Sequence, residues 1–77
     1  MAASTIHAFL KQLDASRTRY SLTSIREGAV MVHVVLPGER WEMEFFEDRG
    51  PEVEVFRSDG TIGGVEKVEE LLRYAAE

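Results

Sequence analysis

Cysteine is absent from this sequence of 77 residues, which excludes disulfide bonds and thiolate metal ligands. Long hydrophobic runs are absent as well, since no run approaches the roughly 18 apolar residues that a membrane-spanning helix needs. The first residues, MAASTIHAF, lack the basic segment and the long apolar segment of a secretion signal. We therefore expect a cytoplasmic protein that is not inserted in a membrane.

Basic residues are scarce in the second half of the chain. Residues 1–38 carry four basic and two acidic side chains, whereas residues 39–77 carry five basic and twelve acidic ones, and the net charge is −5. Binding to a nucleic-acid backbone requires clustered lysine and arginine, so we do not expect a nucleic-acid partner. The length is typical of a single domain, and we treat residues 1–77 as one domain.

The stretch from Val30 to Asp48 organises the rest of the chain. Its two halves each alternate apolar with other residues, which predicts two strands with one buried face each. Pro37 and Gly38 between the halves fit a type II turn. The turn aligns three apolar cross-strand pairs: Val34 with Trp41, Val32 with Met43, and Val30 with Phe45.

Two further segments have the periodicity of amphipathic helices. The first follows a possible cap at Ser4 or Thr5 and ends near residues 15–17; its apolar stripe is Ile6, Phe9, Leu10 and Leu13. The second runs from about residue 65 to residue 76; its stripe is Val65, Val68, Leu71, Leu72 and Ala75. A single stripe on each helix predicts that both lie on the surface of a core.

Two more strands are expected on either side of the central hairpin. Residues 20–26 form the first, with a bulge near Thr23 and Ser24 that turns Ile25 toward the core. Residues 52–57 form the last, with Val53 opposite Phe45. The predicted fold is therefore α+β: a four-stranded antiparallel meander with both helices packed on one face, as a two-layer sandwich.

The opposite face of the sheet carries the candidate interaction site. Its residues are Met31, His33, Glu42, Glu44, Phe46, Glu54 and Phe56. The expected register places Glu44 opposite Glu54, and like charges across a strand pair destabilise a sheet unless a cation or a bound partner relieves them. Large apolar side chains surrounded by charge also mark interaction surfaces.

Three interpretations of this face remain open. It can be an ordinary solvated sheet face, a protein interface, or a metal or small-ligand site built on His33 and the nearby glutamates. The last lacks a second histidine, and a flat sheet offers no pocket to perturb carboxylates for catalysis. We favour an interface, either in a homodimer or with a basic partner protein. We expect no enzymatic activity, no catalytic residue, no metal and no cofactor.

Two sequence motifs carry a resemblance to known proteins. PGERWEMEFFED, followed by VEVFRSDG, resembles short bacterial hypothetical proteins that share a PGERWE-x-EFF core and an SDG turn, over roughly residues 20–72. This resemblance implies no biochemical activity. In size and acidity the chain is also similar to bacterial immunity proteins, which neutralise a basic toxin through an acidic surface, and this likeness implies a basic protein partner.

Overall fold

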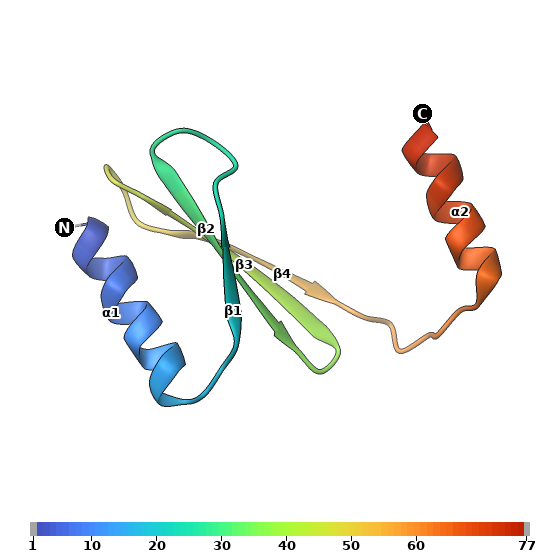
Figure 1. Cartoon of the computed structure of the whole chain (residues 1–77), viewed down its shortest axis with the longest axis horizontal. Coiled ribbons are helices and arrows are strands. Elements are labelled where there is room, and N and C mark those ends of the chain that lie inside the picture. The colour runs from blue at the N-terminus through green and yellow to red at the C-terminus, as the bar shows by residue number, and fades with distance from the viewer. Residues whose placement is uncertain (1, 77) are drawn as a thin grey trace.

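The computed structural model describes the backbone of residues 2–76 and the side chains of residues 6–76. Its elements are α1 (Ala2–Ala15), β1 (Tyr20–Thr23), β2 (Ala29–Leu36), β3 (Glu39–Phe46), β4 (Glu52–Arg57) and α2 (Val65–Ala76). The strands form one antiparallel sheet in the order β1-β2-β3-β4, flanked in sequence by the two helices (Figure 1). The predicted α+β class and the four-stranded meander are confirmed.

The central hairpin has the predicted register. Val34 lies opposite Trp41, and Val32 lies opposite Met43. Gly38 adopts a φ of 73°, which the second central position of a type II turn requires and which costs glycine little. The turn and the apolar parity agree on this register, whereas a one-residue slip would turn the glutamates of β3 toward the face that carries Val32 and Val34.

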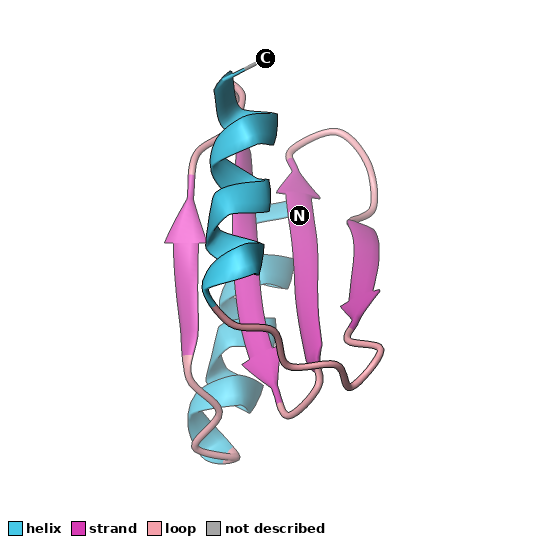
Figure 2. Ribbon diagram, turned by 90° about the vertical axis from the view of Figure 1, so that its right-hand side faces the viewer, coloured by secondary structure: helices cyan, strands magenta, loops and turns pink. Residues whose placement is uncertain are grey.

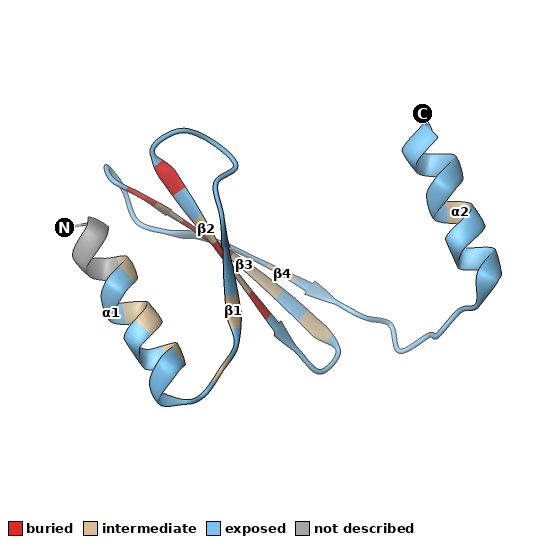
Figure 3. Cartoon of the chain, in the orientation of Figure 1, coloured by how far each residue is buried: buried red, intermediate tan, exposed pale blue. Residues whose placement is uncertain are grey.

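The core lies between α1 and one face of the sheet, which we call the covered face. Val32 is fully buried there and forms a cluster with Val34 and Met43. The α1 stripe packs on this cluster, and the rings of Phe9 and Phe45 meet with centroids 5.5 Å apart. The most deeply buried positions accordingly lie in β2 and β3 (Figure 3).

The start of α1 differs from the predicted start, and the end of α1 is formed by a specific backbone turn. The helix begins at Ala2, before the expected cap, and the side chains of Ser4 and Thr5 lie outside the described residues. At the other end, the backbone N–H of Thr18 donates to the carbonyl of Leu13, and Arg17 has a φ of 58°. This arrangement is a Schellman-type end, which reverses the chain into β1.

The position of α2 differs from the prediction. It was expected on the covered face beside α1, but it lies on the other side of the sheet and stands away from it (Figures 1 and 2). The radius of gyration is 15.7 Å, compared with about 11–12 Å for a compact chain of this length. The apolar stripe of α2 indicated a need for burial, but it did not indicate which surface would provide it.

Two strand details also correct the prediction. β4 is shifted by two residues, so that Val53 lies opposite Met43 rather than Phe45. The shift keeps the same side chains on each face, and the apolar pattern alone therefore could not fix it. β1 ends at Thr23 without the expected bulge, and Ile25 lies exposed in the following loop.

Candidate interaction surfaces

The predicted site lies on the sheet face opposite α1, which we call the open face. Two of its seven residues are buried, so the expectation that they face water is wrong: Glu44 is 5% exposed and Phe46 is 6% exposed. Arginines cause this burial. Nε of Arg26 lies 3.0 Å from Oε2 of Glu44, and the guanidinium groups of Arg26 and Arg49 lie 5.6 and 3.7 Å from the centroid of the Phe46 ring.

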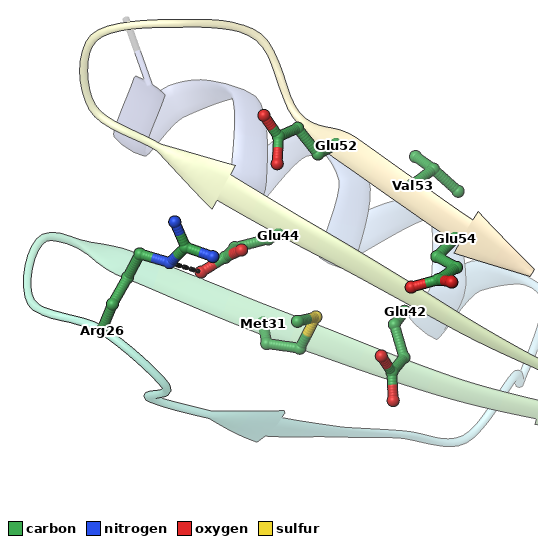
Figure 4. A pocket seen from close by; sticks show the side chains of 7 residues that line it. All are labelled: Arg26, Met31, Glu42, Glu44, Glu52, Val53 and Glu54. Carbon is green, nitrogen blue, oxygen red and sulfur yellow. Dashed lines mark ion pairs between the residues drawn. The ribbon is translucent and has the colours of Figure 1, made fainter.

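Glutamates occupy the middle of the open face. Glu42 lies opposite Glu54, and Glu44 lies opposite Glu52, so two like-charge pairs follow one another across β3 and β4. The predicted pairing of Glu44 with Glu54 is wrong because of the shift of β4. The carboxylates border a shallow depression of about 420 Å³ (Figure 4). Its lining comprises Arg26, Met31, Glu42, Glu44, Glu52, Val53 and Glu54.

Basic groups balance these carboxylates unequally. Glu42 has two neighbours at the limit of ion pairing: the imidazole Nδ1 of His33 lies at 3.6 Å, and Nε of the Arg40 guanidinium lies at 3.5 Å. Nε of Arg49 lies 3.7 Å from Glu52. Within the described residues, no ion pair reaches Glu54. Negative charge on the open face is therefore least compensated at Glu54.

Metal binding finds no support in this geometry. Among the side chains described, no group of three or more histidine, aspartate or glutamate residues is arranged to hold a metal ion. His33 is directed to Glu42, and the carboxylate of Glu44 is paired with Arg26. The suggested metal site at His33, Glu42, Glu44 and Glu54 therefore does not assemble.

The edge of the open face at Phe56 is partly covered. The guanidinium of Arg40 lies 4.3 Å from the centroid of the Phe56 ring, a cation–π contact that leaves the ring about one-third exposed. Met31 is half-buried, and Val35 next to this edge is exposed. The apolar patch expected on this face is therefore smaller than the sequence suggested.

Glu39 ties β4 to β3 at the end from which the chain leaves the sheet. Its Oε1 accepts a hydrogen bond from Nε1 of Trp41 at 2.9 Å, and its Oε2 accepts one from Nε of Arg57 at 3.2 Å. These bonds favour the charged carboxylate, and they hold the pKa of Glu39 below its ordinary value, with the Trp41 bond as the largest cause. The last residue of the sheet is thereby fixed in place.

A second surface, which the sequence assigned to the core, is the apolar stripe of α2. None of the residues 65–76 is buried (Figure 3). Val65, Val68, Leu71 and Leu72 are between 54% and 72% exposed. The periodicity that identified the stripe was correct, whereas its assignment to this chain's own core was wrong.

A third surface is an apolar groove beside α1 on the covered face, which the sequence analysis did not identify. It has a volume of about 490 Å³ and is lined by Ala8, Phe9, Gln12, Met43, Phe45, Pro51 and Val53. None of the described residues that line it is charged. By contrast, acidic and basic residues line both the open-face depression and a depression at residues 14–20. We call this surface the α1 groove.

Comparison with protein family models, curated proteins and solved structures finds no match to this chain. The resemblance to short bacterial proteins therefore stays a prediction, as does the likeness to immunity proteins. Within the described residues, neither helix has the length and apolar character required to cross a membrane.

Proposed function

We propose that this chain is a non-enzymatic, cytoplasmic protein-interaction module, and that the apolar stripe of α2 is its main binding surface. The observation that carries the proposal is the exposure of this stripe on a helix with no buried residue. A helix of twelve residues is at the margin of stability in water unless another surface covers its apolar side. A partner protein that binds the stripe would supply that cover.

The amphipathic character of α2 supports a groove-binding mode of interaction. Its apolar residues recur at intervals of three and four, while Glu66, Lys67 and Glu70 lie on the polar side. Helices that present such anchors bind apolar grooves in a partner, and the anchors provide most of the affinity. The charged side keeps the free helix soluble.

The open face supports a second contact, with a basic protein. The observation that favours it is the pair of successive like-charge contacts, Glu42 with Glu54 and Glu44 with Glu52. A lysine or arginine of a partner placed near Glu54 would relieve this repulsion and increase the rate of association. This contact is the one that an immunity-like role would use.

Affinity capture with matched variants tests the proposal. We expect wild-type protein to bind specific proteins from a bacterial lysate or further copies of itself, and Leu71→Glu to lose that binding. Tyr74→Glu is the control, since Tyr74 is an exposed residue of the same helix outside the stripe. A strictly monomeric wild type that captures the same proteins as Leu71→Glu would contradict the proposal.

A further inference from the structure

We infer that the partner of α2 is a second copy of this chain, and that two copies exchange their α2 helices by docking each stripe in the α1 groove of the other. The inference rests on the proposed function, because it names the partner of the same stripe. It joins two uncovered apolar surfaces of the molecule into one contact.

The two surfaces match in chemistry. The stripe of α2 contains only aliphatic side chains, and the α1 groove is lined without charge by residues of α1, β3, β4 and Pro51. Ala8 on the wall of the groove is small, which allows a second helix to approach α1 closely. The open face is a poorer site for α2, because its glutamates would lie near Glu66 and Glu69 of the helix.

The linker directs α2 away from the chain's own groove. The groove lies on the covered face, whereas α2 lies on the other side of the sheet (Figures 1 and 2). Residues 58–64 connect β4 to α2 and span at most about 25 Å when extended. An intrachain contact would require this segment to fold back around the β4 edge.

Hydrogen bonds stabilise the outward path of the linker. The N–H of Ser58 donates to the carbonyl of Gly38 at 2.9 Å, which anchors the linker to the β2–β3 turn. Oδ1 of Asp59 accepts a bond from the N–H of Thr61 at 2.8 Å, and this bond holds the pKa of Asp59 below its ordinary value. The linker therefore leaves the sheet along a defined course.

A hydrogen bond at the helix start continues this course. Oε1 of Glu66 accepts a bond from the N–H of Gly64 at 2.8 Å, which caps the first turn of α2. The capped first turn favours the helical form of α2, which together with the linker we call the arm, and this lowers the entropy cost of docking on another copy.

The area is sufficient for a stable dimer. Each exposed valine, leucine or isoleucine of the arm offers on the order of 70 Å² of apolar surface, and Ile62 in the linker adds a further apolar side chain that is 95% exposed. Two arms of five such side chains would bury on the order of 700 Å², and complementary surfaces of similar size in and around the two grooves would bring the total to roughly 1,400 Å², within the range of standard protein interfaces. Reciprocal exchange also closes the assembly at two copies.

Light scattering with matched variants tests the inference. We expect wild-type protein to have twice the chain mass of 8.7 kDa. Leu71→Glu in the stripe and Val53→Glu in the groove should each weaken the dimer at least about tenfold. Tyr74→Glu should leave it unchanged. Val53 is 53% exposed in the single chain, so its substitution should preserve the fold, which circular dichroism would verify.

Mixing the two defective variants gives the decisive result. A Leu71→Glu chain keeps an intact groove and a Val53→Glu chain keeps an intact arm, so the mixture should form heterodimers through one good contact although each variant alone is monomeric. A monomeric wild type, or a dimer that survives both substitutions, would overturn the inference. If a monomeric wild type still binds another protein through Leu71, the proposed function stands and only the exchange fails. If Val53→Glu unfolds, Leu71→Glu alone decides, since a dimer that persists would overturn the exchange.

Discussion

The two helices of this protein are both amphipathic but have opposite surroundings. α1 has 14 residues and α2 has 12, and each carries one apolar stripe. The stripe of α1 packs on Val32, Val34 and Met43, whereas that of α2 contacts no comparable surface among the residues that the structure describes. Amphipathic periodicity thus specifies that a face must be covered, while the connecting loops decide whether the same chain covers it.

The connections between the sheet and the two helices also differ. α1 ends in a Schellman-type turn that reverses the chain tightly, so that the helix lies back against the sheet. The linker before α2 instead runs outward from β4 through residues 58–64. A short reversing loop produces an intrachain contact, and a long outward linker produces an arm.

A matched pair of truncations tests the comparison most directly. Phe9→Ala in the α1 stripe should lower the free energy of unfolding by about 2–4 kcal/mol, because the ring is packed against Phe45. Leu71→Ala in the α2 stripe should change it by less than about 0.5 kcal/mol in the monomer. Urea unfolding followed by the fluorescence of Trp41, at concentrations where the chain is monomeric, measures both. Equal costs would show that α2 packs on its own sheet in solution.

The sequence predicted the fold best where two independent signals agree. In the central hairpin, apolar parity and the Pro37-Gly38 turn select the same register, and the structure has it. For the β3–β4 pairing, the alternation of apolar residues was the one signal, and a shift of two residues leaves that alternation unchanged. In the observed register, Glu39 and Arg57 form an ion pair at 3.2 Å. A turn of uncertain length between the strands supplied no second signal.

The interaction surfaces were less predictable than the sheet. Burial of Glu44 depends on Arg26, which lies in a loop whose path no periodic pattern describes. The α1 groove combines residues of one helix and two strands, so it exists only once α1 has been placed on the sheet. Position within a strand predicted the face of each candidate residue, but it could not predict what covers that residue.

Removing Arg26 should have the next largest effect on stability. It tests whether burial on the open face contributes to the stability of the sheet and α1. Arg26→Ala leaves the buried carboxylate of Glu44 without its cation, which should cost about 1–2 kcal/mol because the arginine itself is largely exposed. Lys67→Ala is the control: its ion pair with Glu70 is long and exposed, and its removal should cost at most about 0.5 kcal/mol. Chemical denaturation measures both, and an equal cost would contradict the importance of Glu44 burial.

The hydrogen bond between Trp41 and Glu39 predicts that the stability of the protein depends on pH. This bond lies at the end of the sheet from which the chain leaves toward α2. The folded pKa of Glu39 lies below its ordinary value of 4.5, so its stabilising contribution is present above that pH and is lost as the pH falls through the folded pKa. Trp41→Phe removes the largest cause of this shift. The difference in stability between wild type and variant should therefore shrink on acidification below pH 4.5, as circular dichroism during urea unfolding would show. A constant difference would mean that only packing is lost.

The smallest expected effect concerns the charge of the open face. Glu54→Gln removes one partner of the like-charge contact with Glu42, and no ion pair of Glu54 is lost with it in the described part of the chain. We expect a gain of roughly 0.2–0.5 kcal/mol at low salt. The gain should vanish near 1 M salt, where charges are screened over about 3 Å. Glu47→Gln, in the exposed turn after β3, is the control and should change little at either salt concentration. A gain that persists at high salt would indicate that Glu54 destabilises the strand by its conformational preference, and the open face would then carry no stored repulsion for a basic partner to relieve.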